Sequence, residues 1–149
     1  MNQIKPDDVG ILPMLELFRL EAENQTAILT SSLLELERGA AAPRQLEMLM
    51  RAAHSLKGAA RIVNLQTAVR VAHAMEDCFA LAQQGKLEVR QRETDLLFRG
   101  IDLLGQISKH TEASVARWEA DHAEELREFF DTLASVNPAR APRRCRPRG

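Results

Sequence analysis

Two histidine-centred groups of residues have types and spacing that suit chemistry. His54 is followed by Lys57 and Gly58, and His73 is followed by Glu76. In a helix, residues three or four apart lie on the same face, one turn from each other. A neutral imidazole is a nucleophile near pH 7, a neighbouring carboxylate fixes its tautomer, and an ammonium neutralises phosphoryl oxygens. The combination indicates phosphoryl transfer through a histidine.

His54 is the candidate nucleophile. On a helical wheel it lies roughly 120° from the centre of its apolar stripe, at the border with solvent. Glu76 is the candidate acceptor of the Nδ1 proton, which leaves the Nε2 lone pair for attack on phosphorus. Lys57 is expected to offset the tendency of that carboxylate to favour the imidazolium, and to neutralise charge on the phosphoryl group. His73 is expected to face the same solvent-exposed groove as a supporting residue.

Gly58 and Arg61 share the side of the helix that carries His54. A glycine in a helix interior costs roughly 1 kcal/mol relative to alanine. Beside a reactive imidazole, the missing Cβ leaves room for a phosphoryl group or an incoming protein domain, so we expect Gly58 to provide steric access. Arg61 lies about 20° from His54 on the wheel. Phosphate contact and partner choice are both open as its role.

The composition predicts an all-α protein. The 149 residues include no Tyr, one Trp and seven Gly, while the strong helix formers Leu, Ala, Glu, Arg and Gln are abundant. The apolar period of 3.6 residues and the short connections predict an antiparallel up-down four-helix bundle with an additional C-terminal helix. The five expected helices cover residues 12–38, 43–64, 65–84, 91–109 and 118–136.

Local signals refine these helices. Pro13 suits the first turn of the first helix, and Gly39 and Gly85 suit helix ends. Asp121 and Glu124 have the spacing of a capping box within the last helix. Three methionines are expected to fill the core and two histidines to be surface groups without chemistry: Met48, Met50, Met75, His110 and His122.

The charge is unevenly distributed along the chain. The net charge is −1, but residues 138–149 contain five arginines and no acid, which leaves 15 basic and 21 acidic side chains in residues 1–137. An acidic folded part argues against nucleic acid as a partner. We expect residues 1–137 to form one domain and residues 138–149 a disordered Arg/Pro-rich tail or linker. A tail that contacts an anionic membrane or nucleic acid is the alternative.

The sequence also predicts a cytoplasmic location without membrane insertion. It has no run of 18 apolar residues and no signal-peptide pattern at its start. Its two cysteines, Cys78 and Cys145, are far apart and do not suggest a disulfide framework.

Two segments resemble a known family. The signature of histidine phosphotransfer (HPt) domains is matched by His54-Ser55-Leu56-Lys57-Gly58. The third helix of the amino-terminal P1 domain of CheA-type chemosensory histidine kinases is matched by His73-Ala74-Met75-Glu76-Asp77. The resemblance covers roughly residues 10–136, and it implies that His54 is phosphorylated, with Glu76 bonded to it and Lys57 and His73 supporting. The early Arg61 departs from the small residues that often follow Gly58 in this family.

The resemblance also implies partners. A kinase ATP-binding domain would donate the phosphoryl group, and an Asp in the receiver domain of a response regulator would accept it. Alone, the chain would be a carrier and kinase substrate, not an enzyme, and would need no cofactor. The complete protein would be a CheA-like kinase that begins with this domain.

Two other kinds of function remain as alternatives. One is a non-catalytic helical adaptor whose groove holds a partner. The other is a metal site built from His54, His73 and Glu76, although these residues lie at the edge of their apolar stripes, whereas ligands in a helical bundle point inward.

Overall fold

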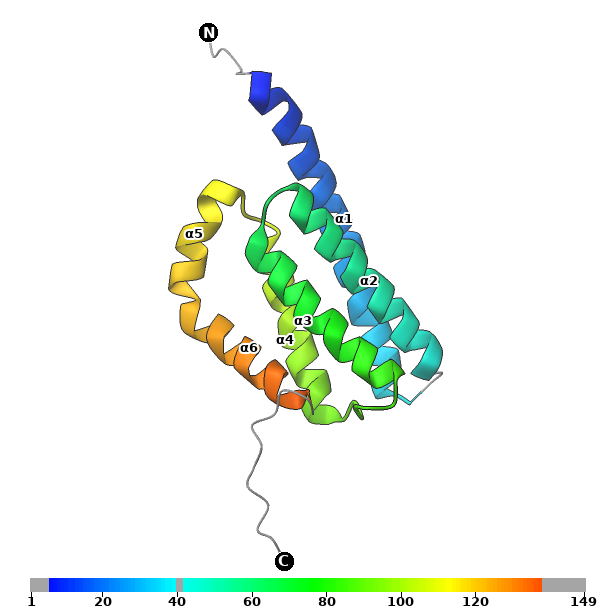
Figure 1. Ribbon diagram of the computed structural model, residues 1–149. Helices are drawn as coiled ribbons and strands as arrows, with labels where there is room; N and C mark the ends of the chain where they lie inside the picture. Colours follow the sequence, from blue (N-terminus) through cyan, green and yellow to red (C-terminus); the bar gives the residue numbers. More distant parts are fainter. Residues whose placement is uncertain (1–5, 40–41, 138–149) are drawn as a thin grey trace, which may run out of the picture.

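The computed structural model describes residues 6–39 and 42–137, with side chains from residue 12 onward (Figure 1). Every regular element in these ranges is a helix: α1 (Pro6–Glu37), α2 (Ala42–Ile62), α3 (Gln66–Gln83), α4 (Gln91–Ile107), α5 (Glu112–Asp121) and α6 (Ala123–Val136). Helices α1 to α4 alternate in direction, which confirms the predicted all-α up-down bundle. The expected tail at residues 138–149 lies outside the described residues.

The first helix begins earlier than predicted. It starts at Pro6, and Pro13 lies in its interior, so the prediction that Pro13 occupies the first turn is wrong. Pro6 itself provides the first-turn proline, whose φ suits a helix and whose missing N–H has no partner to lose there. Pro13 instead leaves the carbonyl four residues earlier without its helical donor. The additional turns make α1 project past the end of α2 (Figure 1).

A tight turn at Asn64 joins α2 to α3. Asn64 has a φ of +57°, a left-handed conformation that asparagine adopts more readily than most residues. The Leu65 N–H donates to the Ala60 carbonyl at 3.0 Å, and the Asn64 N–H donates to the Arg61 carbonyl at 3.1 Å. This Schellman pattern satisfies the last carbonyls of α2 and reverses the chain. As a result α3 packs antiparallel along α2.

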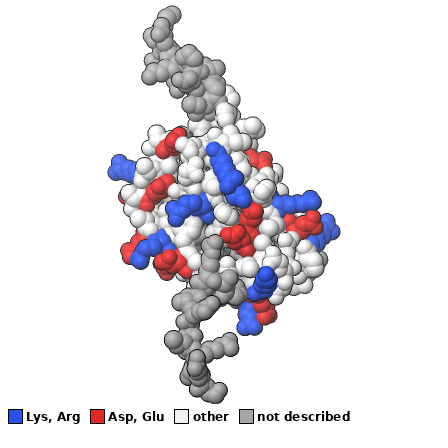
Figure 2. All heavy atoms as spheres, viewed as in Figure 1, with Lys and Arg blue, Asp and Glu red and all other residues white. Residues whose placement is uncertain are grey.

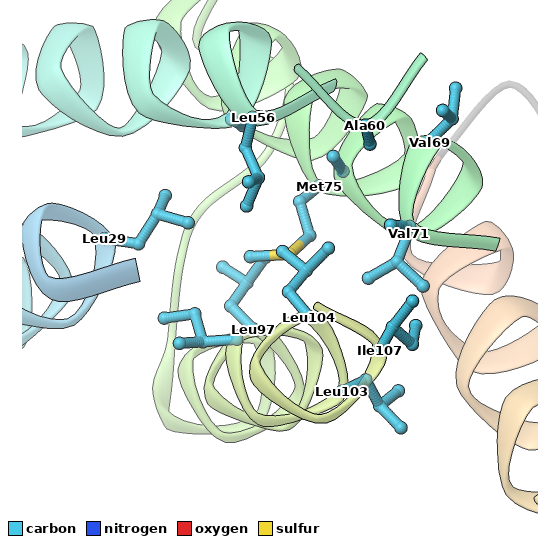
Figure 3. Close-up of a cluster of buried hydrophobic side chains, with 14 of the residues drawn as sticks. Leu29, Leu56, Ala60, Val69, Val71, Met75, Leu97, Leu103, Leu104 and Ile107 are labelled. Carbon is cyan, nitrogen blue, oxygen red and sulfur yellow. The ribbon is translucent and has the colours of Figure 1, made fainter. Parts of the chain in front are cut away.

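The core lies between α1, α2, α3 and α4, and α6 packs against α3 and α4 (Figure 3). The predicted apolar stripes face inward, and Met75 is fully buried as expected. Met48, however, is 39% exposed, so its predicted role as core filler is wrong. It precedes the fully buried Leu49 by one residue, and a step of about 100° along the helix turns it toward solvent.

Gly100 on α4 lets two core side chains approach the helix closely. A Cβ at this position would lie 2.7 Å from Met75 Sδ and 3.0 Å from Phe129 Cζ. Both side chains are fully buried, so neither can move away freely. We expect Gly100→Ala to lower the free energy of unfolding by about 1–2 kcal/mol, because overpacking outweighs the better helix propensity of alanine.

Gly105 on the same helix is the matched control, because a Cβ there meets no atom within 4 Å. Gly105→Ala should raise the free energy of unfolding by up to about 1 kcal/mol. Urea denaturation of the two variants measures both effects. Equal stabilisation by both substitutions would contradict the close packing at Gly100.

The C-terminal addition consists of two helices rather than the single predicted one. The helical conformation is interrupted at His122. Its Nδ1 lies 2.7 Å from the Trp118 carbonyl oxygen, and its ring stacks on the Trp118 ring at a distance of 4.3 Å between ring centres. His122 is therefore half-buried rather than a free surface group. The predicted capping box at Asp121 and Glu124 does not form, because α6 begins one residue later, with His122 at its N-cap.

Candidate functional site

The α2–α3 hairpin places His54 beside Glu76. His54 Nδ1 lies 3.3 Å from Glu76 Oε1. When the imidazole proton is on Nδ1, the Nδ1–H group donates a hydrogen bond to the carboxylate, and Nε2 keeps its lone pair. The His54 side chain is 70% exposed, and Nε2 has no hydrogen-bond partner among the described residues. The site therefore presents a nucleophilic nitrogen to solvent.

Lys57 anchors the other oxygen of the same carboxylate. Its Nζ lies 2.8 Å from Glu76 Oε2 and forms an ion pair with it. The two side chains are only 11% and 16% exposed, so they do not lie on an open surface as the sequence suggested. The helical wheel of α2 missed this burial because α3 covers Lys57 from outside the helix. The ammonium lies against Glu76 rather than in the open space around Nε2.

Glu76 is held in its ionised form by its neighbours. Burial by itself raises the pKa of this carboxyl group. The contacts with Lys57 and then with His54, and the charges of both, outweigh burial and keep the pKa of Glu76 below its ordinary value of 4.5. The carboxylate is thus a fixed acceptor for the imidazole proton at neutral pH.

We expect the stabilisation by this carboxylate to disappear in acid. Because the pKa of Glu76 is lower in the folded chain than in the unfolded chain, its contribution is complete above pH 4.5 and is lost as the pH falls through the folded value. Urea denaturation of the chain and of Glu76→Gln at a series of pH values measures it. The difference between their free energies of unfolding should shrink below pH 4.5, and a difference that stays constant would contradict the pairing.

The remaining predicted site residues lie apart from this contact network. Gly58 is exposed on α2, and a Cβ built there meets no atom within 4 Å. His73 is exposed on α3, where its Nε2 lies 3.5 Å from Asp77 Oδ1 on its own helix. His73 forms no hydrogen bond or ion pair with His54 or Glu76. The structure thus brings together one imidazole, one ammonium and one carboxylate, and not the second imidazole.

Sequence reasoning missed the contribution of α1. Glu21 Oε1 accepts a hydrogen bond from Ser55 Oγ at 3.2 Å, next to His54 in the chain. Met14 and Leu17 line a groove that also contains His54. The signal available in the sequence was that Leu17 falls outside the apolar stripe of its helix. In the structure its side chain is 68% exposed.

Three further observations bear on the kind of site. Within residues 6–39 and 42–137, no group of three His, Cys, Asp or Glu side chains is arranged to hold a metal ion, so the alternative metal site does not form. Among the described helices, none is long and apolar enough to cross a membrane. Figure 2 shows basic and acidic side chains interspersed over the face in view, rather than a large patch of one sign among the described residues.

The chain is similar to known proteins over most of its described length. A model of the "Hpt domain" family matches residues 13–135. Chemotaxis protein CheA of Halobacterium salinarum is 38% identical over 88 residues, which are 59% of this chain and 13% of that protein. Chemotaxis protein CheA of Rhizobium meliloti is 32% identical over 108 residues, which are 72% of this chain and 13% of that protein. The chain therefore spans a small part of the length of these relatives.

A solved structure has the same fold. It is the phosphorylated P1 domain of CheA3 in complex with CheY6 from R. sphaeroides, with a TM-score of 0.70 and 23% sequence identity. The match covers 83% of this chain and 98% of that domain. With the family model matching most of its length, the chain belongs to the Hpt domain family.

Proposed function

We propose that this chain carries a phosphoryl group on His54 Nε2, from a kinase ATP-binding domain to a receiver domain of a response regulator. The main support is the exposed imidazole of His54, whose Nδ1 lies 3.3 Å from the ionised, largely buried carboxylate of Glu76. Membership of the Hpt domain family and the similarity to CheA proteins support the proposal. No cofactor is needed, because the donor and acceptor domains bring the catalytic groups.

The imidazole ring keeps its proton throughout the proposed phosphoryl transfer. The Nε2 lone pair of His54 attacks the γ-phosphorus of ATP, the N–P bond forms, and the P–O bond to ADP breaks. The imidazole gains a positive charge, with its proton still on Nδ1, and the Glu76 carboxylate stabilises that charge. In the second step, an aspartate oxygen of the receiver attacks phosphorus, the N–P bond breaks, and the lone pair returns to Nε2.

Lys57 is proposed to act through Glu76. The 2.8 Å ion pair holds the carboxylate in place, so that the other oxygen can orient the imidazole. The ammonium also keeps the local charge from becoming strongly negative as the phosphoryl group arrives. His73 stays a supporting residue in this proposal, at one helical turn from Glu76 and paired with Asp77.

The chain alone is proposed to be a substrate and carrier rather than an enzyme. We propose that it acts in the cytoplasm as the phosphotransfer domain of a longer CheA-like kinase, with residues 1–137 as the domain and residues 138–149 as a linker. The resemblance to CheA proteins supports this placement.

Phosphorylation in a purified system tests the proposal. The chain is incubated with labelled ATP and an active CheA-type kinase core that lacks its own phosphotransfer domain, and then with a receiver domain. We expect label that is stable in alkali, lost in acid and passed to the receiver. An active core that leaves the chain unlabelled would favour the adaptor alternative.

Gly58→Ala distinguishes an effect on folding stability from an effect on the access of a partner domain to His54. The methyl group meets nothing within 4 Å in the chain itself, so the free energy of unfolding should rise by about 1 kcal/mol. The rate of phosphoryl transfer should fall, because the methyl group projects into space that a partner domain needs. Denaturation and label transfer measure the two effects. A more stable variant with an unchanged transfer rate would remove Gly58 from the site.

A further inference from the structure

A groove between α3 and α6 lies next to the end of the last helix. It has a volume of about 290 Å³, and Leu81, Leu87 and Phe130 form part of its apolar lining. Asn137, the residue at which α6 ends, lines it as well. The groove shares no lining residue with the one that contains His54. The residues that follow Asn137 therefore begin at a surface separate from the proposed phosphoryl site.

Two carboxylates in this groove are available to a cation from outside. Asp131 is exposed on α6, and it forms no ion pair within residues 6–39 and 42–137. Asp77 is 47% exposed, and its contact with His73 Nε2 is long, at 3.5 Å. Arg70, the basic side chain of the lining, lies over the Phe130 ring at 4.4 Å and pairs with neither carboxylate.

The thiol of Cys78 experiences the negative charge of this groove. Cys78 is buried in the lining. Burial, and then the charges of Glu93 and Asp77, raise the pKa of the thiol to about 12. The same two carboxylates that act against a thiolate here attract a cation. An arginine-bearing segment is therefore the kind of occupant that this groove favours.

The segment that follows Asn137 has the matching composition. Residues 138–149 contain five arginines, three prolines and no acid. Proline-rich segments bind in grooves lined by aromatic side chains, and arginine forms charge-assisted hydrogen bonds with carboxylates. Individual ion pairs at a surface are weak. Because the segment starts at the groove, its effective concentration there is at least in the millimolar range, so weak pairs are sufficient.

The segment is also long enough to turn back onto the groove. Asn137 has a φ of −75° and a ψ of +116°, so the backbone leaves α6 in an extended conformation. The part of α6 from Phe130 to Asn137 is about 10 Å long at the helical rise. Six extended residues, as far as Arg143, span about 20 Å. The arginines can therefore reach both carboxylates after a reversal of the chain.

We propose that residues 138–149 dock back into the α3–α6 groove, with their arginines on Asp77 and Asp131. This inference goes beyond the phosphocarrier function and does not depend on it. The docked segment leaves His54 uncovered, because the two grooves have no lining residue in common. It also directs the chain along α3 before any domain that follows.

A nitroxide attached to Cys145 tests this contact in the full chain. The thiol of Cys78 is buried and protonated at neutral pH, so a methanethiosulfonate spin label should react with Cys145 alone. Mass spectrometry counts the labels, and Cys78→Ala is used if two are found. Amide signals of the ¹⁵N-labelled chain are compared before and after the nitroxide is reduced with ascorbate. Broadening is read on α3, at Asp77 and Leu81, because even an undocked segment approaches the end of α6.

The unaltered chain should show this broadening on α3. In the double variant Asp77→Asn with Asp131→Asn it should fall by at least about threefold, since two surface pairs are lost. High salt should reduce it similarly in the unaltered chain. The matched control is Asp95→Asn with Asp121→Asn, which makes the same change of charge at two exposed positions outside the groove. The control should keep the broadening of the unaltered chain.

Three results would overturn the inference. The first is an unaltered chain without broadening on α3. The second is broadening that persists in the Asp77 and Asp131 double variant. The third is broadening in a mixture of spin-labelled ¹⁴N chain and unlabelled ¹⁵N chain, which would show that the segment of a second copy occupies the groove.

Phosphorylation of His54 is measured separately in the same variants. Both double variants should be phosphorylated by the kinase core within about twofold of the unaltered chain, because neither changes a residue of the groove that contains His54. A much lower rate in the Asp77 and Asp131 variant alone would contradict a docked segment that leaves His54 uncovered. A chain that is never phosphorylated would refute the proposed function, while the broadening on α3 would still support the docking.

Discussion

His54→Gln should abolish phosphorylation of the chain and leave its fold unchanged. Glutamine has no nucleophilic ring nitrogen, so the N–P bond cannot form. The side chain of His54 is 70% exposed and contributes nothing to the core, so the free energy of unfolding should change by no more than about 0.5 kcal/mol. Labelling with ATP and the kinase core, together with circular dichroism and urea denaturation, measures both parts of this expectation.

His73→Gln is the matched control for this experiment. His73 is also an exposed histidine, 56% accessible, on the neighbouring helix, but its ring is directed to Asp77 instead of Glu76. This variant should be labelled to the same final extent as the unaltered chain. Loss of label in His73→Gln with full label in His54→Gln would move the phosphoryl group to the other imidazole.

Glu76→Gln should slow phosphorylation of His54 by about tenfold or more without ending it. The amide keeps the shape of the side chain but no longer carries the charge that stabilises the imidazolium-like product. The same change leaves the Lys57 ammonium, only 11% exposed, without its anion. The free energy of unfolding should therefore fall by roughly 1–3 kcal/mol.

A second substitution distinguishes lost stability from lost chemistry. Lys57→Met in the Glu76→Gln background removes the unpaired buried charge and should recover much of the stability. The rate of phosphorylation should stay low, because His54 still lacks a carboxylate at Nδ1. Asp77→Asn, at a half-exposed carboxylate one residue away, should leave the rate unchanged. Recovery of the rate together with stability would show that Glu76 acts only through folding.

The sequence predicts the helices well because burial is periodic along each of them. Leu49, Leu56 and Ala60 recur on one face of α2, and all three are fully buried. The errors lie at ends and breaks. Asn64 follows α2 in a left-handed turn, which an asparagine allows but does not require. His122 interrupts the last predicted helix by stacking on Trp118, a contact that depends on tertiary packing.

The site is predictable to the extent that it depends on one helix at a time. The wheel position of His54 correctly predicts its exposure, and the hairpin correctly predicts a carboxylate nearby. The burial of Lys57 depends on α3. Whether the His73 ring contacts Glu76 or Asp77 depends on its side-chain rotamer, so neither feature follows from the spacing of residues. The groove at Leu17 depends on how α1 crosses α2, which the period of α1 does not specify.

The most direct test is to identify which ring nitrogen of which histidine carries the phosphoryl group. The chain, labelled with ¹⁵N in its histidines, is phosphorylated by the kinase core with ATP, and phosphorus–nitrogen couplings are recorded by NMR. The geometry predicts phosphorus on Nε2 of His54, because Nδ1 is directed to Glu76 at 3.3 Å. Phosphorus on Nδ1 of His54, or on His73, His110 or His122, would contradict the account.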